Sequence, residues 1–287
     1  MKIKITTDST ADEQKEFFDS HDIGYLPQIV NLGGEEYFDT VNITNEDIYN
    51  YVKETKKLPK SAARSVEDFK EFFESYLNNG YDKIVHVSIS THLSCICKNA
   101  QTAAEQIGDD KVYVIDGRML STGTLLLALS AKELADQGKQ AKEIAEIITH
   151  RAYTGQASFV VDTLEFLYKG GRCSMLAAFG ANLLKLKPKL QLVEGKIVAQ
   201  EKYRGKASVV LKKYIDDTLA LYNNPDKKRC FITHTNVEDD VLKEVVEYVK
   251  AKGIFEEVLV STANSVICTH CGKGTLGILY LNDGGNF

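Results

Sequence analysis

The stretch that decides the fold is KIVHVSISTHLSCICKNAQTAAEQIGDDKVYVID, residues 83–116. Its pattern predicts a strand over residues 83–88, a helix over residues 93–107 and a second strand over residues 112–116. Two strands joined by a helix are typical of a parallel sheet, since the helix carries the chain back across one face of the sheet. This segment therefore predicts an α/β fold.

The same alternation continues on both sides of that segment. Further strands are expected at residues 2–7 and 24–31, and further helices at residues 12–20, 46–55, 67–78, 120–137 and 142–153. Thr44 and Ser65 are the predicted N-caps of two of these helices, because each is followed three residues later by an aspartate. The first 154 residues are thus expected to form a three-layer α/β/α domain with a parallel sheet and helices on both faces.

The second half of the chain has a different pattern. Strands are expected at residues 158–162, 189–193, 197–203, 229–234, 257–261 and 275–281, with helices at residues 175–186, 207–222 and 237–252. The tight turn Glu194-Gly195-Lys196 makes two of the strands an antiparallel hairpin. We therefore expect a second domain over residues 155–287, a two-layer α+β unit with a mixed six-stranded sheet. Ligands commonly bind between domains, so the site is expected there.

Composition excludes several classes of protein. The chain has 287 residues, a net charge of −5 and 44% hydrophobic residues, as a globular protein does, and it lacks the basic excess of nucleic-acid-binding proteins. No apolar run is long enough to predict a membrane-spanning helix, and the N-terminal residues do not resemble a signal peptide. We expect a cytoplasmic protein without membrane insertion. No phosphate-binding or dinucleotide-binding motif is present, so no cofactor is expected.

Two glycine-rich segments indicate a site for an anion. The first is Thr163–Arg172, in which Gly170 and Gly171 precede an arginine, and the second is Thr269–Gly274, which carries His270. Glycines allow close approach of the backbone, and a guanidinium pairs well with a carboxylate or phosphate. A Gly-Gly-Arg turn is, however, more often an ordinary strand-to-helix connection. The hydroxyls of residues 88–94 suit ligand binding or helix capping better than nucleophilic catalysis.

These segments, taken together, resemble the DegV family of bacterial fatty-acid-binding proteins. The resemblance rests on residues 7–12, 89–94, 114–123, 163–172 and 269–277, in this order along the chain. It implies that a long-chain fatty acid occupies a tunnel between the two domains. It also implies that the protein is not itself an enzyme, but the lipid-carrying subunit that presents the carboxylate to a separate ATP-dependent fatty acid kinase, which forms an acyl phosphate.

The resemblance also assigns roles to individual residues. Ser61 and Ser94 are expected to hydrogen-bond the carboxylate, and Arg172 and His270 to serve phosphoryl transfer or docking of the partner. Thr91 and Gly171 lie in the same motifs and complete the expected ligand-binding set.

Cysteines offer an alternative function on the same scaffold. Cys95, Cys97, Cys268 and Cys271 all lie in the motif segments, and the last two have CxxC spacing around a histidine. Thiolates and imidazoles at such spacing suit a zinc site or a redox-active thiol pair. The simpler interpretation is that small buried thiols fill loop positions, and we expect no metal.

Overall fold

Four parallel strands form the sheet predicted for the first half of the chain. The computed structural model describes residues 1–108, 110–173 and 186–285, and it orders these strands β2-β1-β6-β7. Their bounds are β1 (Ile3–Asp8), β2 (Ile23–Leu26), β6 (Lys83–Ser88) and β7 (Val112–Asp116). β6 and β7 therefore have the predicted bounds, and their pairing is parallel throughout.

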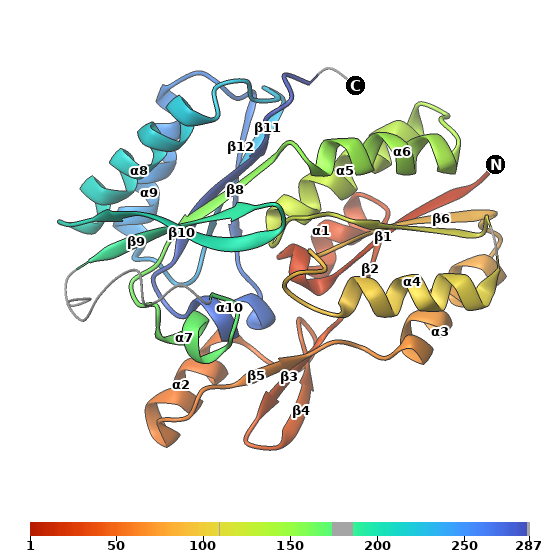
Figure 1. Cartoon of the computed structure of the whole chain (residues 1–287), viewed down its shortest axis with the longest axis horizontal. Coiled ribbons are helices and arrows are strands. Elements are labelled where there is room, and N and C mark those ends of the chain that lie inside the picture. Colours follow the sequence, from red (N-terminus) through yellow and green to blue (C-terminus); the bar gives the residue numbers. More distant parts are fainter. Residues whose placement is uncertain (109, 174–185, 286–287) are drawn as a thin grey trace.

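Helices cover both faces of this sheet, as predicted (Figure 1). α3 (Val66–Asn78) and α4 (Ile96–Ile107) pack on one face, and α5 (Thr122–Asp136) and α6 (Ala141–Ala152) pack on the other. Both predicted N-caps are confirmed, because Thr44 and Ser65 form capping boxes at the starts of α2 (Asn45–Thr55) and α3.

A separate six-stranded sheet forms from the second half, in the order β10-β9-β8-β13-β11-β12. Its strands are β8 (Gly155–Val160), β9 (Lys187–Val193), β10 (Lys196–Tyr203), β11 (Arg229–His234), β12 (Glu257–Thr262) and β13 (Leu276–Leu281). β11 and β12 are parallel and the other pairs antiparallel, so the sheet is mixed, as predicted. α8 (Ala207–Leu221) and α9 (Asp239–Ala251) cover one face (Figure 1).

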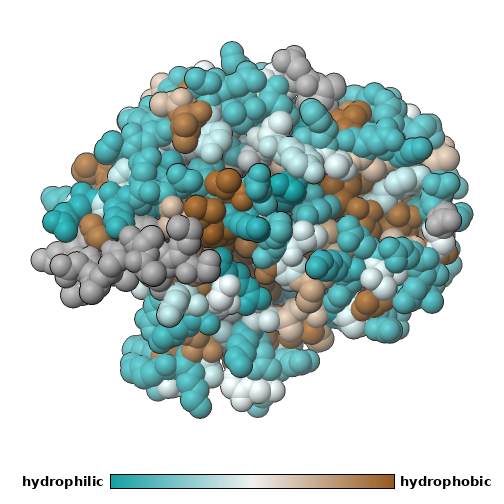
Figure 2. All heavy atoms as spheres, in the orientation of Figure 1, coloured by the Kyte–Doolittle hydropathy of each residue, from teal (hydrophilic) through white to brown (hydrophobic). Residues whose placement is uncertain are grey.

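Helix α5 lies between the two sheets and joins their cores. It contacts β1 and β6 on one side and β8, β11 and β13 on the other. A helix packed on two sides cannot keep a polar stripe, and Leu125, Leu127, Ala128 and Ala131 are completely buried. The helix expected at residues 120–137 is thus present as α5, and most of it is buried. The surface is largely hydrophilic, with apolar side chains gathered near the middle of the face in Figure 2.

The single strand predicted at residues 24–31 is wrong. The segment divides into β2 and β3 (Ile29–Leu32), which belong to different sheets. Pro27 lies between them and cannot donate a hydrogen bond to a sheet ladder, so pairing is interrupted there. β3 instead pairs antiparallel with β4 (Glu35–Phe38) and β5 (Lys60–Ala62), which makes a third, three-stranded sheet.

Other differences concern short elements at the ends of strands. The helix predicted at residues 12–20 begins instead at Lys15, as α1 (Lys15–Ser20), after the 3-10 turn η1 (Ser9–Ala11). Helix α4 begins at Ile96, three residues later than predicted. Two short helices, α7 (Glu165–Lys169) and α10 (Ser265–Cys271), were not predicted. The Gly170–Gly171 pair follows α7, and the helix predicted at residues 175–186 lies almost wholly outside the described residues. No helix in the described part of the chain could span a membrane.

Candidate functional site

A cavity of about 360 Å³ lies where both halves of the chain meet. Its walls come from β5, the segment between β6 and α4, the residues just before α5, and α7, β10 and α10. Most lining side chains are apolar, and the polar ones include Ser61, Ser94, Arg172 and His270. The lining residues are Thr10, Ser61, Ala62, Ala63, Ile89, Leu93, Ser94, Cys95, Ile96, Leu120, Leu167, Arg172, Ile197, Val266, Ile267, His270 and Cys271.

Ser61 and His270 form the first contact of the polar group. Ser61 Oγ lies 2.7 Å from His270 Nε2, although the two residues are 209 positions apart in sequence. Burial and, to a smaller extent, the nearby Arg172 guanidinium lower the pKa of His270 to about 3. The imidazole is therefore neutral at physiological pH, and it hydrogen-bonds without carrying a charge.

This pair is a poor arrangement for nucleophilic catalysis. His270 Nδ1 has no hydrogen-bond partner in the described structure, so no carboxylate orients the ring. A histidine with a pKa near 3 is also a weak general base at neutral pH. The geometry supports binding of a polar group by Ser61 and His270 rather than activation of the Ser61 hydroxyl.

Gly170 and Arg172 continue the polar group on the far side of His270. A Cβ atom at Gly170 would lie 2.8 Å from His270 Nδ1, so the glycine permits the imidazole to pack against the backbone. Arg172 Nη1 donates to Gly170 O at 2.6 Å, and Nε donates to Leu93 O at 3.4 Å. Within the described part of the chain, no carboxylate forms an ion pair with Arg172. Its positive charge is therefore available to an anion.

Ser94 completes the polar group beside Leu93. Its Oγ accepts a hydrogen bond from Ile96 N at 3.3 Å, at the start of α4, and the hydroxyl proton remains free to donate. A chain of contacts thus runs from Ser61 through His270, Gly170 and Arg172 to Leu93, which precedes Ser94. We call this set of residues the polar end of the cavity.

Two residues of the expected ligand-binding set lie outside the cavity lining. The Thr91 hydroxyl donates to Asp116 Oδ2 at 2.6 Å, and Thr91 N donates to the same carboxylate, so this side chain fixes the loop after β6. Gly171 is exposed and has a φ of 74°, which turns the chain after α7. The structure therefore brings Ser61, Ser94, Arg172 and His270 together, and it places Thr91 and Gly171 beside them.

Buried carboxyl groups, which the sequence did not assign to the site, hold helix α10 in position. Asp12 Oδ1 accepts from Asn264 N and Asp39 Oδ1 accepts from Ser265 N, both at 2.8 Å. These bonds satisfy backbone donors at the start of the helix that carries His270. Burial raises the pKa of Asp39 to about 7 and that of Asp12 well above its ordinary value. Asp12 lies within residues 7–12, one of the motifs on which the family resemblance rests, and this was the signal that could have assigned it to the site.

The cysteines do not assemble a metal or thiolate site. Cys95 is exposed and lines the cavity, whereas Cys97, Cys268 and Cys271 are buried. Burial raises the pKa of Cys97 and of Cys271 to about 12 and that of Cys268 well above its usual value, so these thiols stay protonated. Among the described residues, no three histidine, cysteine, aspartate or glutamate side chains are placed to hold a metal.

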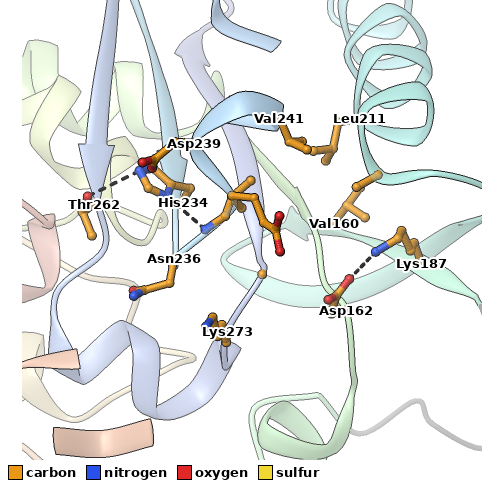
Figure 3. Close-up of a pocket in the computed structure, with 14 residues that line it drawn as sticks. Val160, Asp162, Lys187, Leu211, His234, Asn236, Asp239, Val241, Thr262 and Lys273 are labelled. Atoms are coloured by element: carbon orange, nitrogen blue, oxygen red, sulfur yellow. Dashed lines mark hydrogen bonds and ion pairs between the residues drawn. The ribbon is translucent and has the colours of Figure 1, made fainter. Parts of the chain in front are cut away.

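A second, larger hollow of about 810 Å³ lies at the ends of β8 and β11 (Figure 3). It is open, and Asp162, Lys187, Asp239 and Lys273 are among the residues that line it. Asp162 and Lys187 form an ion pair on one side of it, and His234 accepts a hydrogen bond from Val237 N at 3.4 Å. These charged side chains make the hollow less suited to an apolar ligand than the cavity at α10.

Comparison with known proteins identifies the family. The family model described as "Uncharacterised protein, DegV family" matches residues 2–283. The chain is 30% identical over 284 residues to a fatty acid-binding protein of Thermotoga maritima, covering 96% of each chain.

Solved structures agree with this match. A fatty-acid-binding DegV family protein from Thermus thermophilus has 30% identity and a TM-score of 0.90, covering 98% of this chain and 99% of its own. The fatty acid binding protein DegV of Bacillus subtilis has 29% identity and a TM-score of 0.85, with the same coverage. The chain belongs to the DegV family.

Proposed function

We propose that this protein binds one long-chain fatty acid in the cavity of about 360 Å³. The observation that carries the proposal is an apolar cavity that has hydroxyls and an arginine without a carboxylate partner at one end. The carboxylate lies at the polar end and accepts hydrogen bonds from Ser61 and Ser94. Relatives at 29–30% identity, named as fatty-acid-binding proteins, support this assignment.

Elementary energetics favour such a ligand. Each buried methylene contributes about 0.8 kcal/mol, so the acyl chain supplies most of the affinity. A hydrogen bond to a charged carboxylate contributes about 1.5–3 kcal/mol, which is enough to orient the chain. Because residues from both 1–154 and 155–287 line the cavity, we place the ligand tunnel between two domains divided near residue 154.

We further propose that the protein presents the carboxylate to a separate, ATP-dependent fatty acid kinase in the cytoplasm. Arg172 supplies a positive charge beside the carboxylate, where charge develops as an acyl phosphate forms. His270 is neutral and holds Ser61, so the polar end contains groups for binding and charge stabilisation but no strong general base.

The binding proposal is tested with Ser94→Ala. We expect about 10- to 150-fold weaker binding of a long-chain fatty acid, as loss of one hydrogen bond to a carboxylate predicts. Ser75→Ala is the matched control, because Ser75 is exposed on α3 and its hydroxyl donates to Phe72 O, away from the cavity. Equal affinity of Ser94→Ala and wild type would remove Ser94 from the carboxylate site.

The presentation proposal is tested with Arg172→Ala and a bacterial fatty acid kinase subunit supplied with ATP. We expect the variant to retain most of its lipid and to lose acyl-phosphate formation. Loss of lipid and of phosphorylation in equal proportion would instead make Arg172 a binding residue and contradict its separate role in transfer.

A further inference from the structure

Ser90 belongs to the loop that carries Ser94, but it lies outside the cavity lining. It follows β6 and is completely buried. Its hydroxyl accepts a hydrogen bond from His92 N at 3.2 Å, and its carbonyl oxygen accepts from Leu93 N at 3.0 Å and from Ser94 N at 3.3 Å. A serine that bonds the backbone two residues further on stabilises a tight turn. Ser90 therefore sets the path of the chain up to Ser94.

The same hydroxyl also reaches the second half of the chain. Ser90 Oγ donates to Gly195 O at 2.8 Å, although the two residues are 105 positions apart in sequence. Gly195 lies in the turn between β9 and β10, and this hairpin continues beyond Lys189–Gln191, where β9 pairs with β8. Figure 1 shows the hairpin reaching toward the first sheet. One hydroxyl group thus joins the turn before Ser94 to the second sheet.

Gly195 permits this close approach because it has no side chain. A Cβ added there would lie 2.6 Å from Ser90 Oγ and 3.2 Å from His92 Cδ2, and the φ of 77° also favours glycine. Gly195 is buried, whereas its neighbours Glu194 and Lys196 are exposed. The tip of the hairpin is therefore packed against the loop after β6 through the one residue that can approach the loop so closely.

Ser90 also connects two other segments that line the cavity. Its backbone N donates to Met119 O at 2.9 Å, next to Leu120 of the lining, and the hairpin that it contacts carries Ile197, which is also part of the lining. Three segments from different parts of the chain thus meet at Ser90, and each of them reaches the cavity. A residue in this place affects the ligand through the segments that it holds.

We propose that Ser90 is a positioning residue for the ligand carboxylate. By tying the turn before Ser94 to the β9–β10 hairpin, it holds the Ser94 hydroxyl where that hydroxyl donates to the carboxylate. This inference rests on the proposed binding of fatty acids at the polar end. Without the Ser90 hydroxyl, His92 N and Gly195 O lose a partner, and the turn that leads to Ser94 loses its fixed position. The acyl chain keeps its apolar contacts, so the loss falls mainly on the carboxylate.

The test compares binding of hexadecanoic acid with that of its methyl ester, which has the same acyl chain but no carboxylate charge. Ser90→Ala should weaken binding of the acid by about three- to tenfold and binding of the ester by less than about twofold. Ser88→Ala is the matched control, because Ser88 is equally buried at the end of β6 and its hydroxyl donates to Asp8, within the first half of the chain. The control should leave the ratio of the two affinities unchanged.

A double variant shows whether Ser90 acts through Ser94. In the Ser94→Ala background, Ser90→Ala should weaken binding of the acid by less than about twofold, because the contact that it positions is already absent. Gly195→Ala forces the hairpin away from Ser90 Oγ while the hydroxyl remains, so it should also lower the affinity for the acid relative to the ester. This variant keeps the inference testable if Ser90→Ala does not fold.

Two results would overturn the inference while fatty acid binding itself stands. One is that Ser90→Ala weakens binding of the acid and of the ester equally, as general damage to the cavity would. The other is that the full effect of Ser90→Ala persists in the Ser94→Ala background. If wild type binds no long-chain fatty acid at all, the proposed function fails and this inference fails with it.

Discussion

Gly170 and Gly171 are adjacent, yet the structure requires glycine at each for a different reason. A Cβ at Gly170 would lie 2.8 Å from both His270 Nδ1 and Phe166 O, while its φ of −74° suits any residue. Gly171 has a φ of 74°, and a Cβ added there would have no atom within 4 Å. Replacement by alanine therefore tests close packing at the first position and backbone conformation at the second.

The expected magnitudes differ accordingly. In Gly170→Ala, His270 must move away and lose its 2.7 Å contact with Ser61, which costs about 0.5–1.5 kcal/mol, in addition to about 1–3 kcal/mol for overpacking. The free energy of unfolding should fall by about 2–4 kcal/mol, and fatty acid binding should weaken. Gly171→Ala should cost about 1–2 kcal/mol of stability for the left-handed backbone, with a smaller effect on binding.

Urea unfolding and a fatty acid competition assay measure both quantities on the two variants. At a compatible φ, replacing glycine by alanine ordinarily stabilises a protein by about 0.4–1 kcal/mol, because the unfolded chain loses entropy. A Gly170→Ala variant that is more stable than wild type and binds fatty acid normally would refute the close packing of Gly170 against His270.

Three further predictions concern a carboxyl group, a buried ion pair and a thiol. The folded pKa of Asp39, about 7, is above its unfolded value of about 3.8, so its contribution to the free energy of unfolding is present at low pH and is lost as pH rises from about 4 to 7. Urea unfolding across this range should show the stability of wild type relative to Asp39→Asn falling by about 1.4 kcal/mol per pH unit. Parallel plots of unfolding free energy against pH for the two proteins would contradict this. Arg151 is buried and pairs with Asp226 and Asp283 at 2.7 and 2.8 Å, so Arg151→Ala should lower the unfolding free energy by about 3–5 kcal/mol in urea unfolding. A loss below about 1 kcal/mol would show that removing Arg151 does not leave the two carboxylates buried without a partner charge. Cys95 should react first with an alkylating reagent, and fatty acid should slow that reaction, as followed by intact-protein mass; equal rates with and without lipid would place Cys95 outside the occupied cavity.

Sequence patterns predicted the elements whose boundaries depend on local signals. β6, β7 and β11 have the predicted bounds, because each is a short run rich in β-branched and aromatic residues between turn signals, and both capping boxes follow from residues three positions apart. The error at residues 24–31 came from a continuous apolar pattern, in which Pro27 was the signal for a break. α10 was missed because the donors at its start bond to Asp12 and Asp39, which are distant in sequence.

The site depended on contacts that no local pattern contains. Ser61 and His270 meet across 209 residues, and the family resemblance, rather than spacing, placed both in one site. Thr91 lies in the same motif as Ser94, yet its hydroxyl bonds to Asp116, because the direction of a side chain depends on the loop around it.

Binding of a fatty acid is the central claim, and native mass spectrometry of protein purified without added ligand tests it most directly. The account predicts that a substantial share of the molecules carries an adduct of one long-chain fatty acid, released on denaturation, and that Ser94→Ala carries less of it. Protein that carries no such adduct, and that takes up none when incubated with long-chain fatty acids, would contradict the claim.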